Sequence, residues 1–207
     1  MSEVTIWIVI GFISGSIPWA LLVGKVLVGK DIRGVGDANP GTANAWKLGG
    51  WLPGTLSLLL EISKGFLPVY FALQYLGHPS DFISQVSLSI IAISPVLGHA
   101  WTPFLGFKGG KALASSGGSW IAVTSGLALP AMLILLGLIH GFQKNHAITV
   151  TLSMVGLVVL AVVLGLGVYI ALFGLANFIV IVWKHRSEYS DGVIVRKWVL
   201  GIMRPSP

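Results

Sequence analysis

Residues 148–183 read ITVTLSMVGLVVLAVVLGLGVYIALFGLANFIVIVW and contain no charged side chain. A helix that crosses the hydrocarbon core of a bilayer needs about 20 mostly apolar residues, so this run is too long for a single crossing. Gly165 and Gly167 lie near its middle, where glycine permits the backbone to turn. The run therefore predicts two membrane-spanning helices that are joined at these glycines.

Four further apolar runs lie along the chain. They are 4–28, 51–76, 82–97 and 112–142. The last contains Pro130, and its length fits either one long helix or two short helices broken at the proline. Polar segments separate the runs. They are two Gly-rich loops at 29–50 and 98–111, a turn at 77–81, a polar link at 143–146 and a basic tail at 184–207.

Composition supports a membrane protein with one domain. Of the 207 residues, 55% are hydrophobic and 10% are charged, whereas a soluble domain carries about 25% charged residues. The length suits a single helical bundle over residues 1–207 and leaves no room for a second sizeable domain. The absence of cysteine excludes thiol chemistry. The net charge of +6 is explained by membrane topology, so we expect no nucleic-acid partner.

Basic residues concentrate in particular loops. They are Lys25, Lys30, Arg33 and Lys47 in or beside the first loop, Lys108 and Lys111 in the second, Lys144 in the link, and Lys184, Arg186, Arg196, Lys197 and Arg204 in the tail. Because such residues remain on the cytoplasmic side, these loops should share one face of the membrane. Two helices in 112–142 and two in 148–183 satisfy this condition. We predict an all-α integral membrane protein, a compact bundle of about seven transmembrane helices. A five-helix alternative would leave Lys144 alone outside.

The first Gly-rich loop carries groups that suit a phosphate ligand. It combines glycines, amides, a hydroxyl and cations, at Gly34, Gly36, Gly41, Asn39, Asn44, Thr42, Arg33 and Lys47. Glycines let backbone N–H groups approach a ligand closely, and the cations supply charge. The alternative is a loop packed on itself, in which Asn and Asp make turns.

The second Gly-rich loop ends in Gly109-Gly110-Lys111 and enters a predicted helix that carries Ser115. Free N–H groups and an ammonium at the positive end of a helix dipole favour an anion. The loop is not a Walker A motif, because the upstream glycine spacing is absent and Ala112 follows the lysine. The alternative is a plain turn at the membrane interface.

Glu61 and Lys64 are the charged residues inside the predicted span 51–76. A charge at that depth costs several kcal/mol unless it is paired or lies in a wet cavity. The two residues are either a mutual salt bridge or part of a functional site. The sequence contains no His-Glu-x-x-His motif and no cysteine cluster, so we expect no metal and no other cofactor.

A set of short motifs is distributed in order along nearly the whole chain. They are Gly15-Ser-Ile-Pro18, Asp31-Ile-Arg33, Asn39, Gly41, Asn44, Lys64-Gly-Phe-Leu-Pro68, Gly98-His99, Phe107-Lys-Gly-Gly-Lys111 and Lys184-His-Arg186. This set resembles the PlsY-type acylphosphate:glycerol-3-phosphate acyltransferases. The resemblance implies a multi-pass protein of the bacterial inner membrane whose active site faces the cytoplasm. It also implies acyl transfer from acyl phosphate to the sn-1 hydroxyl of glycerol 3-phosphate, forming lysophosphatidic acid in phospholipid biosynthesis. An enzyme that produces acyl phosphate would be a further partner.

The resemblance also assigns roles to residues. His185 and Lys111 are the expected catalytic residues. The expected substrate ligands are Asn39, Gly41, Thr42, Asn44, Lys47, Gly109, Gly110, Ser115, Thr149, Thr151 and Glu188. No side chain needs to act as a strong base, because a bound phosphate oxygen would accept the proton of the acceptor hydroxyl.

Two carboxylates depart from the family pattern. Asp37 and Glu188 stand where the family has Ser and Asn, and they bring negative charge toward the expected phosphate site. Either they are paired with Lys47 and Arg186, or the acceptor is not plain glycerol 3-phosphate. They also favour the rival hypothesis, a non-enzymatic membrane transporter or a binding paralogue for a phosphate ester.

Overall fold

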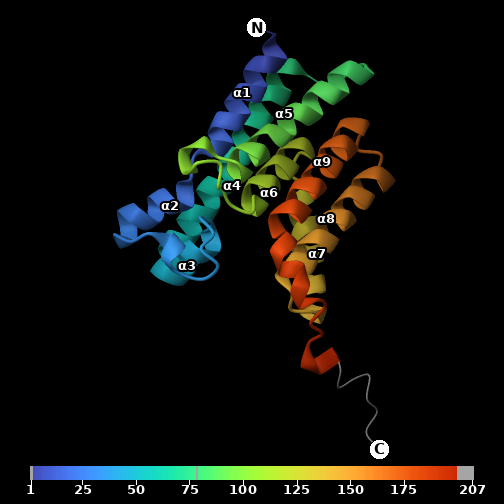
Figure 1. The fold of residues 1–207 in the computed structure, drawn as a ribbon. Helices are drawn as coiled ribbons and strands as arrows, with labels where there is room; N and C mark the ends of the chain where they lie inside the picture. Colours follow the sequence, from blue (N-terminus) through green and yellow to red (C-terminus); the bar gives the residue numbers. More distant parts are fainter. Residues whose placement is uncertain (1, 78, 200–207) are drawn as a thin grey trace, which may run out of the picture.

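A computed structural model describes residues 2–77 and 79–199 and shows an elongated bundle of helices (Figure 1). The α-helices are α1 (Glu3–Ser16), α2 (Trp19–Val23), α3 (Thr42–Gly49), α4 (Trp51–Leu76), α5 (Phe82–Ala100), α6 (Leu113–Val123), α7 (Ala128–Phe142), α8 (His146–Val163) and α9 (Val168–His185). Five segments of the described chain are long and apolar enough to cross a membrane, and α7 is a shorter apolar helix. With α6, these helices confirm the predicted all-α membrane bundle of about seven helices.

Breaks within the apolar runs follow backbone chemistry. Gly165 and Gly167 have φ values of +62° and +117° and separate α8 from α9, which confirms the predicted division. The α6–α7 break was predicted at Pro130, and this position is wrong. The chain turns instead at Ser125 and Gly126, which have φ values of 51° and 94°. Pro130 lies in the first turn of α7, where helices tolerate proline because the first N–H groups have no intrahelical partner.

The run 4–28 was expected to form one helix, but the structure divides it. It breaks between α1 and α2 at Ile17 and Pro18, because proline lacks an N–H and clashes with the preceding turn. Side chains of α4 satisfy the groups that the break frees. The Glu61 carboxylate accepts from the Ala20 N–H at 3.0 Å, and Lys64 Nζ donates to the Ile17 carbonyl at 2.7 Å.

Small residues bring α4 and α6 into backbone contact. A Cβ added to Gly65 would lie 2.1 Å from the Ser115 carbonyl oxygen, and one added to Gly118 would lie 2.1 Å from the Ile62 carbonyl oxygen. Glycine is therefore required at both positions, as is common where membrane helices pack closely. The contact fixes the first turn of α6 relative to the charged part of α4.

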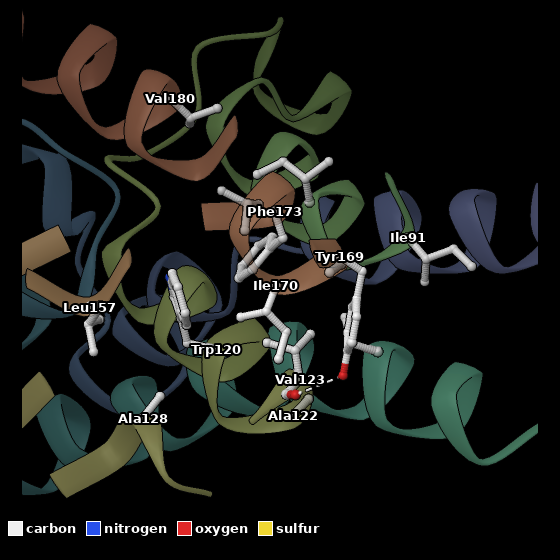
Figure 2. Close-up of a cluster of buried hydrophobic side chains, with 14 of the residues drawn as sticks. Ile91, Trp120, Ala122, Val123, Ala128, Leu157, Tyr169, Ile170, Phe173 and Val180 are labelled. Carbon is white, nitrogen blue, oxygen red and sulfur yellow. Dashed lines mark hydrogen bonds between the residues drawn. The ribbon is translucent and has the colours of Figure 1, made fainter. Parts of the chain in front are cut away.

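Aromatic side chains fill the interface between α6 and α9 (Figure 2). The rings of Trp120 and Phe173 have centroids 5.1 Å apart, and both side chains are buried. The Tyr169 hydroxyl donates to the Val123 carbonyl at 3.1 Å, so its polar group is satisfied inside the bundle. This core holds α9 against α6, and it thereby sets where the far end of α9 lies.

The polar loops gather at one end of the bundle. Contacts of Lys111 join the first and second Gly-rich loops to the segment after α9. The Lys144 N–H donates to the Ile194 carbonyl at 2.8 Å, so the 143–146 link lies at the same end. The described N-terminus lies at the opposite end (Figure 1). This arrangement is the one that the charge distribution predicted, although Arg204 lies outside the described residues.

Candidate active site

A cavity of about 520 Å³ opens among the polar loops. Its lining comes from the first loop, α4, α5, the starts of α6 and α8 and the end of α9. The predicted site residues that line it are Asn39, Gly41, Thr42, Lys47, Lys111, His185 and Glu188. A second cavity of about 540 Å³ lies between α4 and α6 toward the other end, but no charged residue lines it. The first cavity is therefore the candidate site for a phosphate ester.

Lys111 lies between two carboxylates. Its ammonium is 2.6 Å from Asp37 Oδ2 and also contacts the Glu188 carboxylate. We call these three residues the charge cluster. Burial alone would raise the pKa of Asp37, but the hydrogen bond and charge of Lys111 and the donors from Asn39 and Asn44 lower it to about 2. Burial alone would lower the pKa of Lys111, but its two carboxylate partners raise it. Asp37 and Lys111 are therefore both ionised at neutral pH.

The partners of the two carboxylates differ from those that the sequence suggested. Pairing with Lys47 and Arg186 was one of two alternatives, whereas the structure pairs both carboxylates with Lys111. Arg186 donates to the Trp183 carbonyl at 2.8 Å and lies 4.7 Å from the Trp183 ring centroid. A phosphate that binds Lys111 must therefore compete with two carboxylates already in place.

Asn44 organises the first loop from within. Its Nδ2 group donates to Asp37 Oδ1 and to the Asn39 carbonyl, each at 2.9 Å. Gly36 has a φ of +64°, and a Cβ there would lie 2.3 Å from Asn44 Oδ1 and 3.0 Å from Lys47 Nζ. The loop is thus packed on itself at Asn44. Asn39, Thr42 and Lys47 of the same loop line the cavity. One part of the loop is therefore packed on itself, and another part is placed to contact a ligand.

Glu61 belongs to a buried network behind the cavity. Its Oε2 atom is 2.6 Å from Lys64 Nζ and 2.9 Å from His99 Nδ1. The mutual salt bridge, one of the two alternatives from the sequence, is present, and both of its residues also contact the backbone beside Pro18. Glu61 and His99 both line the cavity, and no role was predicted for His99 from the sequence. His99 directly follows Gly98 in one of the motifs that carry the family resemblance, and this position was the signal that could have identified it.

His185 lines the cavity, and one of its ring nitrogens has no hydrogen-bond partner among the described residues. Its Nδ1 atom lies 2.9 Å from the Ile181 carbonyl, so Nδ1 carries the proton and donates it. In that tautomer Nε2 has a lone pair. Nε2 is buried and has no hydrogen-bond partner among the described residues. His146, which was not predicted as a site residue, also lines the cavity, and its ring centroid lies 5.9 Å from that of His185.

The two glycines before Lys111 lie outside the cavity lining, in contrast to their expected role as phosphate ligands. The Gly109 carbonyl accepts from Lys184 Nζ at 3.0 Å. Gly110 backs the His99 ring, because a Cβ there would lie 2.3 Å from Nε2. These glycines allow the loop to pass close to the end of α5.

Three hydroxyls expected to bind substrate are occupied elsewhere. Ser115 donates to the Pro95 carbonyl at 3.2 Å. Thr149 contacts the Gln143 side chain and donates to the Asn145 carbonyl at 3.0 Å. The Thr151 hydroxyl pairs with the Tyr189 hydroxyl at 2.6 Å. All three residues lie outside the cavity lining. Their hydroxyl groups are hydrogen-bonded to a neighbouring turn or helix, as is common for hydroxyls on helices.

An apolar bundle with such a cavity at one end defines an integral membrane protein with a candidate active site among its polar loops. A family model for glycerol-3-phosphate acyltransferase matches residues 5–193. Glycerol-3-phosphate acyltransferase 1 of Thermotoga maritima is 29% identical over 207 residues, which cover 94% of this chain and 97% of that protein. The glycerol-3-phosphate acyltransferase of Endomicrobium trichonymphae is 33% identical and covers 88% of each chain.

A solved structure extends the likeness to three dimensions. The crystal structure of PlsY (YgiH), an integral membrane glycerol 3-phosphate acyltransferase, in its glycerol 3-phosphate form matches with a TM-score of 0.81. Its sequence is 26% identical, and the match covers 99% of this chain and 100% of that one. The chain therefore belongs to the glycerol-3-phosphate acyltransferase family.

Proposed function

We propose that this protein transfers a fatty acyl group from acyl phosphate to the sn-1 hydroxyl of glycerol 3-phosphate in the cavity around Lys111. The products are lysophosphatidic acid and inorganic phosphate. The observation that carries the proposal is that Lys111, a cation, and His185, whose buried Nε2 atom has no partner among the described residues, line one polar cavity. Family membership supports an acyl transfer to glycerol 3-phosphate.

Phosphate binding would use both lysines of the cavity. Lys47 and Lys111 supply positive charge, and Asn39 and Thr42 supply neutral donors. The incoming phosphate would take the place of one or both carboxylates on Lys111. The carboxylates would then act as built-in competitors that raise the KM and ease the release of phosphate-bearing products.

The acyl transfer itself needs little acid–base chemistry from the protein. The acceptor hydroxyl oxygen attacks the acyl carbonyl carbon, the bond between that carbon and the phosphate oxygen breaks, and the departing phosphate takes the hydroxyl proton. Before the attack, Nε2 of His185 would accept a hydrogen bond from the hydroxyl and hold its oxygen in line with the carbonyl, and the proton would then pass to the phosphate as it departs. Catalysis would then rest on positioning and on charge stabilisation.

A reconstitution assay tests this function against the rival one. Purified protein in liposomes receives palmitoyl phosphate and radiolabelled glycerol 3-phosphate, and lysophosphatidic acid is measured. We expect product with the acyl phosphate and none with palmitoyl-CoA. Uptake of label into the liposomes without any lipid product would instead identify a transporter of phosphate esters.

The polar end of the bundle is proposed to face the cytoplasm of a bacterial inner membrane, which the one-sided distribution of Lys and Arg supports. The cysteine-free chain allows a direct test with single cysteines at Lys144 and Ser80, both exposed and at opposite ends. In intact spheroplasts, a membrane-impermeant thiol reagent should label Ser80→Cys rapidly and Lys144→Cys only after lysis. The reverse pattern would overturn this orientation.

Removing the two competing carboxylates should improve the apparent affinity for the acceptor. We predict that Asp37→Ser combined with Glu188→Asn lowers the KM for glycerol 3-phosphate at least about threefold, because each carboxylate repels the phosphate and competes for Lys111. The matched control is Asp31→Asn with Asp191→Asn, which removes two exposed carboxylates outside the cavity lining. Loss of all activity in the first double variant would show that the carboxylates are working parts of the site.

A further inference from the structure

Lys184 directs its ammonium into the polar end of the bundle. Nζ donates to the Ala100 carbonyl at 2.9 Å and to the Gly109 carbonyl at 3.0 Å, and it lies 5.5 Å from the centroid of the Trp101 ring. A lysine ammonium has three N–H donors, and two carbonyls and an aromatic face satisfy a group of that kind. These contacts tie Lys184 to backbone and ring atoms, and the residue does not line the cavity.

The two carbonyls belong to segments that touch each other. Ala100 is the last residue of α5, where carbonyl groups lack intrahelical donors and a cation is favoured. The Gly109 backbone rests directly on this helix end, since a Cβ there would lie 2.0 Å from the His99 carbonyl oxygen and 2.8 Å from that of Ala100. Lys184 therefore joins α9, the end of α5 and the second Gly-rich loop at one point.

Each joined segment carries a residue of the cavity. His99 directly precedes Ala100, Lys111 follows two residues after Gly109, and His185 directly follows Lys184. We propose that Lys184 is a positioning residue that fixes His99, Lys111 and His185 relative to one another without touching substrate. The proposal rests on the acyl transfer function given above, but its structural part is measurable without activity.

The simplest alternative is that Lys184 is only a topology anchor, as basic residues at helix ends often are. An anchor needs charge and water, whereas this side chain is half-buried and makes three directed contacts. Another alternative is a direct phosphate ligand. Both alternatives predict kinetics that differ from those of a positioning residue.

The test compares Lys184→Met with Lys108→Met, an equal loss of charge at an exposed position in the loop that Lys184 contacts. Activity is measured with palmitoyl phosphate and glycerol 3-phosphate. Lys184→Met should lower kcat at least about tenfold and change the KM for glycerol 3-phosphate less than about threefold, because misplaced catalytic groups chiefly slow the chemical step. Lys108→Met should match the wild-type protein.

A distance measurement reports the positioning directly. Spin labels at Phe107→Cys and Ser190→Cys, both exposed, flank the joined segments in a chain that has no other cysteine. Pulsed electron spin resonance should give a narrow distance distribution in the otherwise wild-type and Lys108→Met proteins and a broad one in Lys184→Met. If Lys184→Met does not fold, Lys184→Gln retains amide donors and should give a smaller broadening and a smaller loss of kcat.

Two results would overturn the proposal. Wild-type kcat and a narrow distribution in the Lys184 variant would leave this residue as an anchor. A raised KM with unchanged kcat and a narrow distribution would make it a substrate ligand. Broadening in a protein that shows no acyl transfer in its wild-type form would refute the proposed reaction while supporting the structural role of Lys184.

Discussion

A His185→Phe variant should lose at least about a hundredfold in kcat/KM, which is the size of the loss when a reacting group is displaced by about 1 Å. Phenylalanine retains the ring shape but cannot accept a hydrogen bond from the acceptor hydroxyl. Nε2 of His185 has no partner among the described residues, and His185 lines the cavity, so a substrate bound beside the ring would supply the missing donor. Lysophosphatidic acid formation by purified protein measures the effect.

The matched control is His140→Phe on α7. His140 does not line the cavity, and among the described residues its ring makes one long hydrogen bond, 3.4 Å, with the Thr149 hydroxyl. This variant should retain nearly all activity. If His185→Phe were equally active, the hydroxyl would be oriented by another group, and His99 or His146 would be the next residue to examine because both line the cavity.

Replacing Lys111 by methionine should be at least as damaging. It leaves Asp37 and Glu188 without their shared cation and facing the incoming phosphate. Two unit charges about 6 Å apart at an effective dielectric constant of 20 repel each other by roughly 2–3 kcal/mol, which corresponds to about a hundredfold in kcat/KM. Steady-state kinetics with glycerol 3-phosphate as the varied substrate would measure the loss.

A combined variant separates repulsion from lost binding. Adding Asp37→Ser and Glu188→Asn to Lys111→Met should recover part of the activity, because the unpaired carboxylates are then absent. Lys111→Arg should also lose at least about tenfold, since a planar guanidinium binds carboxylates in a forked geometry and would be released less readily to the phosphate. Full activity in Lys111→Arg would contradict the assignment of Lys111 as a phosphate ligand.

Apolar runs and loop charges predicted most of the fold, because lipid exposure and membrane orientation act on local sequence. The division at Gly165 and Gly167 is one example, and the shared end of the polar loops is another. The break near Pro130 was misplaced, because proline in the first turn of a helix does not interrupt it. The break at Pro18 depends on Glu61 and Lys64, which are distant in sequence, so local reasoning had no means to predict how it is stabilised.

Part of the candidate site could also be predicted from local sequence. Lys47, Lys111 and His185 lie in short motifs of polar residues, and the fold brings them to one cavity. Their roles toward substrate stay predictions. Thr149 and Thr151 have the same chemical groups as cavity residues, but a neighbouring helix turn or loop uses them. Sequence shows which groups are available, and only the fold shows which of them are already hydrogen-bonded.

A crystal structure with bound glycerol 3-phosphate tests the central claim most directly. The account predicts the phosphate about 3 Å from Lys111 Nζ, with at least one carboxylate of the charge cluster displaced, and a glycerol hydroxyl about 3 Å from His185 Nε2. Glycerol 3-phosphate bound elsewhere, with the Asp37–Lys111–Glu188 contacts intact, would contradict it.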